Sequence, residues 1–136
     1  MTTREFIGKC VHGYIANERT CSSVYFDGKH IYSYGTHYPL LIQVAGKWIL
    51  NDAGYSNTTA KHINWASGYA DYTLNIPNGR SAERNDPQGL LEIANKELES
   101  LQSTYDSKKR KDTKVAASLL QRIETITKTR DFLART

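Results

Sequence analysis

The sequence lacks the long apolar run that a membrane-spanning helix requires. Such a helix needs about 18 or more consecutive apolar residues, and no stretch of this chain approaches that length. The opening Met-Thr-Thr-Arg-Glu contains no apolar core of a secretory signal peptide. We therefore expect a cytoplasmic protein with no membrane partner.

Cysteine is also scarce, since the chain has only Cys10 and Cys21. Their spacing matches no metal-binding motif, and free thiols are the usual state in a reducing compartment. We expect two free thiols rather than a disulfide. A zinc site built from His37, His62 and a cysteine is a minor alternative, because it has no motif spacing.

Common catalytic motifs are missing as well. Gly-rich phosphate loops, nucleophile elbows and Asp-rich magnesium clusters are absent from the sequence. We therefore expect no cofactor, no metal and no catalytic residues, which favours a binding protein over an enzyme.

The residues that are present indicate one globular domain. The chain has 136 residues, of which 39% are hydrophobic and 24% charged, enough for one substantial core. The formal net charge is +4 and the isoelectric point is about 9.1. This small positive charge permits an acidic partner such as nucleic acid without requiring one.

Turn signals divide the first half of the chain into short elements. The helical spacing of Phe6, Ile7, Cys10 and Val11 predicts a first helix that ends at Gly13. Aromatic and β-branched residues between glycine-containing turns, one of them at Ala45-Gly46, then predict an antiparallel meander. The expected strands are 23–26, 30–34, 40–44 and 47–51, with a last strand at 71–76.

Three details of the meander depend on single residues. The pair Asp27-Gly28 predicts a type I′ hairpin turn, which needs positive φ at both central positions. Alternation along the next strand places His30, Tyr32 and Tyr34 on one face. Pro39 cannot donate a ladder hydrogen bond, so its strand is expected at a sheet edge or begins after it.

Helical spacing returns after the meander. A helix is expected over about 57–68, with Ser56 or Asn57 as its N-cap. Thr58 and His62 are one turn apart on this helix and share a face.

The chain from Asp86 onward is predicted to form a helical hairpin. Asp86 is the expected cap and Pro87 the first residue of a helix of about 20 residues. A second amphipathic helix follows the polar, basic connector 107–114, with Asp112 as its expected cap. The apolar seams are wider than one hairpin can bury, so the hairpin is expected to pack on the sheet or on a second copy in a homodimer.

These elements predict an α+β fold. We expect a small antiparallel sheet of four or five strands with flanking helices, followed by a C-terminal antiparallel helical hairpin. Residues 1–80 would form the α+β head domain, and residues 86–136 the hairpin.

Two motifs in the head lie 15 residues apart, Tyr34-Gly35-Thr36-His37-Tyr38-Pro39 and Tyr55-Ser56-Asn57-Thr58-Thr59-Ala60-Lys61-His62. They resemble a small uncharacterised domain of hypothetical proteins from bacteriophages and other mobile elements. The resemblance covers about residues 6–70 and leaves out the hairpin. It implies no activity. It implies an accessory protein of a phage or plasmid, and such proteins often block host defence systems or handle DNA.

Histidines and hydroxyl groups of these motifs form a first candidate site. The two imidazoles could act as acid and base, although no carboxylate stands at a regular spacing from either, and Asp52 is the nearest plausible partner. We favour a structural alternative, in which His37 bonds a backbone carbonyl and His62 bonds a tyrosine hydroxyl that locks helix to sheet. The candidate residues are Tyr34, His37, Tyr55, Ser56, Thr58 and His62.

Aromatic and basic residues form two further candidates. Tyrosines of the meander could stack the bases of single-stranded nucleic acid, although tyrosine is also an ordinary strand residue. The connector could reach a phosphate backbone or an acidic protein face, although such a cluster is more often a solvated turn. The candidate residues are Tyr25, Tyr32, Tyr34, Tyr38, Lys108, Lys109, Arg110 and Lys111.

The sequence is consistent with four functions. We favour an anti-CRISPR-like inhibitor of a host defence complex, which binds a host protein or ribonucleoprotein complex or its nucleic acid. The alternatives are a nucleic-acid-binding accessory protein without a defence target, a small hydrolase built on His37 and His62, and a structural phage component.

Overall fold

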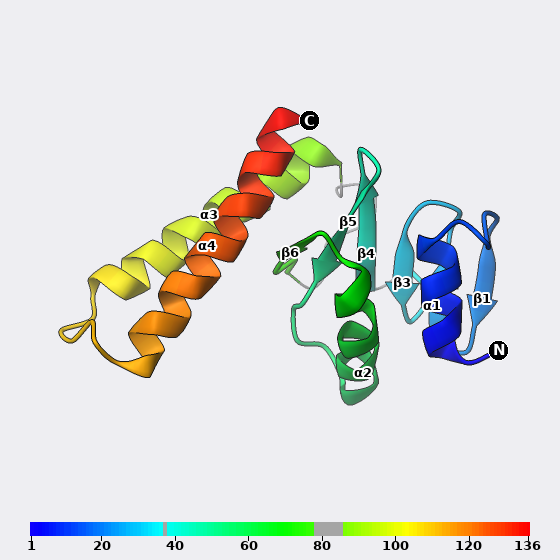
Figure 1. Cartoon of the computed structure of the whole chain (residues 1–136), viewed down its shortest axis with the longest axis horizontal. Helices are drawn as coiled ribbons and strands as arrows, with labels where there is room; N and C mark the ends of the chain where they lie inside the picture. The colour runs from blue at the N-terminus through cyan, green and yellow to red at the C-terminus, as the bar shows by residue number, and fades with distance from the viewer. Residues whose placement is uncertain (37, 78–85) are drawn as a thin grey trace.

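The computed structural model describes residues 1–36, 38–77 and 86–136, in which a six-stranded sheet has helices on both faces (Figure 1). The predicted α+β fold with a C-terminal helical hairpin is confirmed. The strands are β1 (Arg19–Cys21), β2 (Val24–Phe26), β3 (Ile31–Ser33), β4 (Tyr38–Val44), β5 (Lys47–Asn51) and β6 (Tyr72–Leu74). The helices are α1 (Thr3–Val11), α2 (Asn57–Ala66), the 3-10 helix η1 (Ser67–Tyr69), α3 (Pro87–Asp106) and α4 (Lys114–Arg135).

The strands lie in the sheet in the same order as in the chain, from β1 to β6. The first four pairings are antiparallel, and the meander pattern predicts the three among β2, β3, β4 and β5 but not the pairing of β1, whereas β6 runs parallel to β5. This parallel pairing arises because α2 and η1 form a crossover between the two strands, which returns the chain in the same direction. The sheet thus has one strand more than the upper expectation.

Pro39 is the second residue of β4, a strand with neighbours on both sides, so it lies neither in an edge strand nor before the start of its strand, and both expectations are wrong. Ile31 pairs with Leu41 but Tyr32 pairs with Pro39, and this register shift marks a bulge. A bulge tolerates proline because the ladder is already interrupted there.

Two hairpin turns differ in how closely they follow their sequence signals. Ala45 and Gly46 both have positive φ, 50° and 77°, as a type I′ turn requires, and the turn fixes the β4–β5 register. At the other turn Gly28 has positive φ but Asp27 does not, so the type I′ prediction is wrong there. The Asp27 carboxylate instead accepts hydrogen bonds from the N–H groups of Lys29 and His30.

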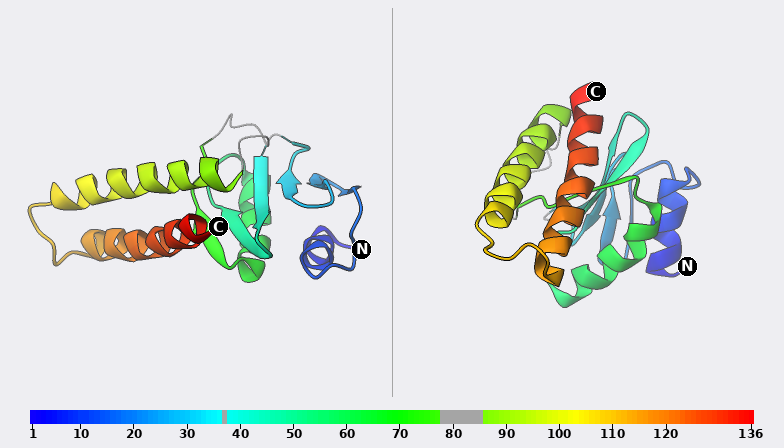
Figure 2. Two further views of the ribbon diagram at one scale, coloured as in Figure 1. Left: turned by 90° about the horizontal axis from the view of Figure 1, so that it is seen from above. Right: turned by 60° about the vertical axis from the view of Figure 1, so that its left-hand side comes forward.

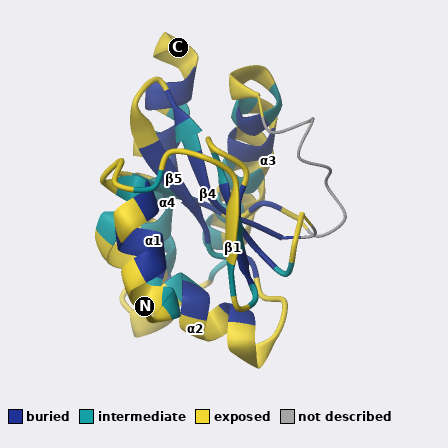
Figure 3. Cartoon of the chain, turned by 90° about the vertical axis from the view of Figure 1, so that its right-hand side faces the viewer, coloured by how far each residue is buried: buried dark blue, intermediate teal, exposed yellow. Residues whose placement is uncertain are grey.

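The sheet separates two hydrophobic cores. Most of β4 and β5 is buried, which Figure 3 shows in dark blue. Alternation along β5 explains the division, because Trp48 and Leu50 belong to the core with α1 and α2, whereas Ile49 belongs to the core with α3 and α4. Both faces of the central strands are therefore buried. None of the described helices is both long and apolar enough to cross a bilayer.

The hairpin is fixed to the sheet at its base. Asp86 caps α3 by accepting from the N–H of Gly89, and Thr113, rather than the predicted Asp112, caps α4 by accepting from the N–H of Ala116. The second core takes its hairpin residues from 90–101 and 126–133. The rest of the hairpin projects away from the sheet, which Figure 2 shows from above.

Polar contacts from the hairpin cover the outer edge of β6. The Thr129 hydroxyl donates to the carbonyl oxygen of Thr73 at 2.7 Å, and Glu97 accepts the N–H of Asn75 at 3.0 Å. These side chains satisfy backbone groups that an open sheet edge would present to other chains. The opposite edge is β1, which is three residues long.

Candidate functional site

A buried polar cluster joins α2 to β3. The Ser33 hydroxyl lies 2.8 Å from His62 Nδ1 and 3.0 Å from the Thr59 hydroxyl, and none of the three residues is more than 3% exposed. Ser56, the N-cap of α2, accepts the N–H of Thr59. The helix is thus bonded to the sheet through a serine hydroxyl, so the predicted tyrosine partner of His62 is wrong. Thr58 is exposed, and its neighbour Thr59 makes the contact instead.

The geometry of this cluster favours a structural role for His62. Burial lowers its pKa, which favours the neutral imidazole. A serine beside an imidazole is a common nucleophile and base, but Ser33 is fully buried and its hydroxyl is not accessible to a substrate. His37 lies outside the described residues, so its pairing with His62 as acid and base stays a prediction.

Three predicted site tyrosines gather where β4 begins and β5 ends. The ring of Tyr55 lies 6.1 Å from that of Tyr34 and 5.5 Å from that of Tyr38, between centroids. Tyr38 is buried, and its hydroxyl donates to the carbonyl oxygens of Asn51 and Ala53 at 2.9 and 2.6 Å. The buried ring of Tyr38 therefore cannot stack a nucleic-acid base, and the stacking role predicted for it is wrong.

Tyr25 and Tyr32 form a second aromatic pair, stacked with centroids 5.9 Å apart. Tyr32 is 2% exposed, so the prediction that it stacks a nucleic-acid base is also wrong. The two hydroxyls donate to carboxylates, that of Tyr25 to Glu18 and that of Tyr32 to Asp27. A phosphate group would meet these carboxylates, so the pair is poorly suited to nucleic acid.

The basic connector lies at the tip of the hairpin, away from the sheet (Figures 1 and 2). Asp106 and Asp112 partly offset its charge, and the ion pair between Arg110 and Asp112 is 3.5 Å long with side chains 77% and 75% exposed. An ion pair this exposed is weak and leaves the guanidinium open to a partner. The five cations of the tip are Lys108, Lys109, Arg110, Lys111 and Lys114.

Lys111 has a structural role within the tip. Its ammonium group donates to the carbonyl oxygens of Tyr105 and Lys108 at 3.2 and 2.9 Å, and lies 5.0 Å from the centroid of the Tyr105 ring. A cation there complements the negative end of α3. Lys111 thus shapes the tip, while the exposed Lys109, Arg110 and Lys114 are available for contact.

The start of α4 adds to the positive potential of the tip. Thr113 caps the helix, and its first turn holds Lys114 and no acidic residue. The N-terminus of a helix attracts anions because its N–H groups and its macrodipole present positive charge. The N-terminus of α4 and the lysines of the tip both attract anions. The tip is therefore the candidate functional site.

Several buried polar residues make contacts that the sequence does not indicate. Ser33 and Thr59 are buried partners of His62, and Asn51 is a buried hub that bonds Pro39, Ala53 and Ile76. These partners lie on different elements, and no local spacing indicates such contacts. Within the described residues, no three His, Cys, Asp or Glu side chains are grouped to hold a metal ion.

Comparison with known proteins gives no relative from which a function can be transferred. No family model, no curated protein and no solved structure matches the chain.

Proposed function

We propose that this is a binding protein whose helical hairpin carries a basic tip to a polyanionic target. The target is nucleic acid, or the nucleic-acid-bearing surface of a host complex. The observation that supports this most directly is the position of Lys109, Arg110 and Lys114, which lie exposed beside the N-terminus of α4 at the far end of the hairpin.

The hairpin is suited to reaching a target. Its longer helix, α4, has 22 residues and is therefore about 33 Å long at a rise of about 1.5 Å per residue. Arg122 anchors α4 near the middle, because it bonds Asp52 of the head and Glu97 of α3. An anchored, projecting tip can contact phosphates without a clash between target and sheet.

The biological setting follows from the motif resemblance and is part of the proposal. In a phage or plasmid, such a protein would act in the host cytoplasm as an inhibitor of a defence complex, anti-CRISPR-like, by occupying nucleic acid or the surface that binds it. A nucleic-acid-binding accessory protein without a defence target would use the same tip. The acidic neighbours of Tyr25 and Tyr32 favour the tip over the tyrosine face in both cases.

Binding to nucleic acid tests the molecular part of the proposal. Fluorescence anisotropy with a labelled duplex and a labelled single strand would be measured over a range of salt concentrations. For a triple variant, Lys109→Ala, Arg110→Ala and Lys114→Ala, we expect at least about tenfold weaker binding and a salt slope on duplex DNA smaller by roughly 2 to 3.

A matched control removes three exposed cations of the head, through Arg4→Ala, Lys47→Ala and Lys61→Ala. This variant has the same net charge as the tip variant and should retain most of the binding. Equal losses in the two variants would show that net charge rather than the tip drives binding, and would contradict the proposal.

Inhibition of host defence is tested by plasmid interference in hosts with active defence systems. Wild-type protein should rescue plasmid uptake in at least one system, and the tip variant should not. If binding to nucleic acid is confirmed but no system is rescued, the accessory-protein alternative is supported instead.

A further inference from the structure

The connector at the tip of the hairpin offers cations but no aromatic ring. Between Asp106 and Asp131 the sequence has no phenylalanine, tyrosine or tryptophan. Tyr105, the aromatic residue closest to the connector in the sequence, is half-buried, and the ammonium group of Lys111 lies 5.0 Å from its ring centroid. Proteins that bind single-stranded nucleic acid usually stack successive bases on exposed aromatic rings. The described residues 86–136 present no freely exposed ring of this kind at the tip.

The positive charge of the tip does not continue along the helices. On α3, the sequence has no lysine or arginine between residues 96 and 108. On α4, Arg122 is the only cation between residues 114 and 128, and its guanidinium is already bonded to Asp52 and Glu97. A single strand is bound along a positively charged groove that follows its backbone. Neither helix of the hairpin provides such a path away from the tip.

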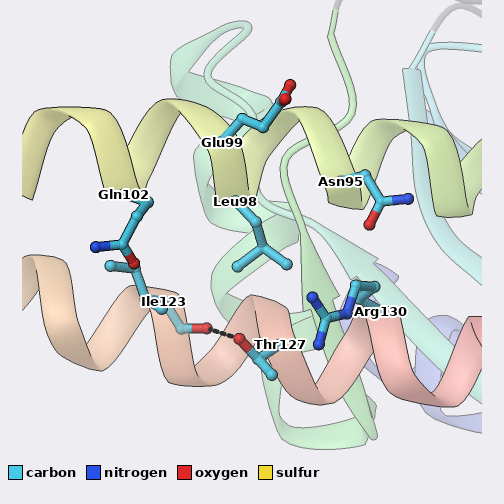
Figure 4. A pocket seen from close by; sticks show the side chains of 7 residues that line it. All are labelled: Asn95, Leu98, Glu99, Gln102, Ile123, Thr127 and Arg130. Atoms are coloured by element: carbon cyan, nitrogen blue, oxygen red, sulfur yellow. Dashed lines mark hydrogen bonds between the residues drawn. The ribbon is translucent and has the colours of Figure 1, made fainter.

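The groove between α3 and α4 has no excess of positive charge either (Figure 4). It has a volume of about 470 Å³, and five of its seven lining residues are polar. Its charged groups are one carboxylate, that of Glu99, and one guanidinium, that of Arg130, which pairs with Asp131 at 3.0 Å. A chain of phosphates in this groove would therefore gain little electrostatic attraction. The groove is not the cationic channel that a single strand needs.

The width of the hairpin keeps its tip out of the grooves of a duplex. The helices α3 and α4 run side by side up to the connector (Figures 1 and 2). Two packed helices are about 20 Å across, because each is about 10 to 12 Å in diameter and their axes lie about 8 to 10 Å apart. The major groove of B-DNA is about 12 Å wide and admits one helix. The exposed Lys109, Arg110 and Lys114 therefore meet phosphates at the edges of a groove rather than bases within it.

We propose that the tip binds the phosphate backbones of a nucleic-acid duplex, end-on and independently of sequence. This inference rests on the proposed function, because it names the form of nucleic acid that the same site binds. Duplex DNA carries one charge per about 1.7 Å of its axis, about twice the density of a single strand, so a compact cluster of cations gains more from the duplex. Contacts to phosphates carry no sequence information. Lys109, Arg110 and Lys114 thus select the duplex by its charge density.

Competition among nucleic acids tests this inference on the wild-type protein. A labelled DNA duplex of about 20 base pairs is displaced, in fluorescence anisotropy, by unlabelled competitors of the same length. The competitors are DNA duplexes of AT-rich, GC-rich and mixed sequence, an RNA duplex and a single strand of thymidine nucleotides. We expect the three DNA duplexes to compete within about threefold of one another, and the single strand to compete at least about fivefold more weakly than any duplex.

Two tyrosine variants test whether a ring takes part. Tyr105→Leu should change the affinity for the single strand by less than about twofold, because the ring of Tyr105 is half-buried beneath Lys111, whereas loss of a stacked base would cost about fivefold or more. Tyr55→Leu makes the same change at a ring of the head that is 50% exposed, and should also leave this affinity unchanged. The wild-type competition does not depend on either variant.

Three results would overturn the inference. They are a single strand that competes as well as the duplexes, a spread of more than about tenfold among the DNA duplexes, and a loss of about fivefold or more in a tyrosine variant. The tip variant, Lys109→Ala, Arg110→Ala and Lys114→Ala, separates this inference from the proposed function. If it binds duplex DNA as tightly as the wild type, the proposed function fails. Binding that depends on the tip but favours the single strand refutes only the choice of the duplex.

Discussion

The guanidinium of Arg122 donates to both carboxylate oxygens of Asp52, at 2.6 and 2.9 Å, although 70 positions separate the two residues in the chain. The same side chain donates through Nε to Glu97 of α3 at 2.8 Å. One arginine therefore joins the end of β5 to both helices of the hairpin. Its side chain is only 26% exposed, so water screens these interactions less than it screens surface pairs.

Replacement of Arg122 by methionine should destabilise the protein. Arg122→Met retains the aliphatic stem but leaves two partly buried carboxylates without their partner. We expect the free energy of unfolding to fall by roughly 2 to 3 kcal/mol in urea denaturation. Arg130→Met removes an exposed pair with Asp131 and should cost less than about 0.5 kcal/mol. Equal losses in the two variants would refute the anchoring role of Arg122.

Asn51 is expected to be among the most sensitive polar residues. It is 1% exposed, its Nδ2 donates to the carbonyl oxygen of Pro39, and its Oδ1 accepts from the N–H groups of Ala53 and Ile76. Asn51→Ala would leave buried backbone groups unpaired and should lower the free energy of unfolding by about 3 kcal/mol. Exposed Asn64→Ala is the control, with an expected change below about 0.5 kcal/mol. Thermal denaturation of both variants would distinguish these outcomes.

Stability should fall in mild acid because two histidines are held in the neutral form. Burial lowers the pKa of His62 and of His30 below the ordinary 6.5, and His30 Nδ1 accepts the N–H of Gln43, which requires an unprotonated nitrogen. The unfolded chain therefore binds more protons once the pH falls through 6.5. Above that pH both states are neutral and the full stability is present.

We expect the free energy of unfolding, measured by urea denaturation, to be constant from pH 8 to about 7 and to decrease from about 6.5 downward, with a slope of up to about 1.4 kcal/mol per pH unit for each histidine. The urea midpoint should fall over the same pH range. The double variant His30→Gln and His62→Gln should lose most of this slope. His12→Gln, at an exposed position, should retain it. A wild-type midpoint that does not change down to pH 5 would contradict the prediction.

The β4–β5 turn offers a stabilising substitution. Ala45 has a φ of 50°, which asparagine adopts more readily than alanine, and Gly46 already supplies the second positive φ of the type I′ turn. Ala45→Asn should therefore raise the melting temperature, with a gain of about 0.5 kcal/mol. Ala60→Asn, on the exposed face of α2, should lower it. A decrease for Ala45→Asn would indicate that the turn is not strained.

Local signals in the sequence predicted much of the fold. Asp86 and Pro87 marked the start of α3, and the pair Ala45-Gly46 marked the β4–β5 turn, because caps and tight turns depend on a few adjacent residues. The parallel β6 and the bulge at Pro39 could not be predicted in this way. Both depend on how distant segments meet, and a bulge shifts register without a distinctive composition.

The candidate site shows the same division. The basic tip was visible because its cations are adjacent in the chain, and its place at the end of the hairpin followed from the helical periodicity. The prediction that tyrosines of the meander stack nucleic-acid bases was wrong for Tyr32 and Tyr38. Alternation along a strand shows which residues share a face, but it does not show whether other elements cover that face. Tyr32 and Tyr38 proved to be buried, and the anchor Arg122 carried no local signal at all.

The coverage of β6 has a consequence for behaviour at high concentration. With Thr129 and Glu97 occupying backbone groups along that edge, new strands from neighbouring molecules can join the described sheet at β1. A template of three residues supports only a short ladder, so polymerisation into fibres has a poor starting point. Loss of the hairpin would expose the outer edge of β6 as well, and a clipped molecule would then offer a second edge for strand pairing.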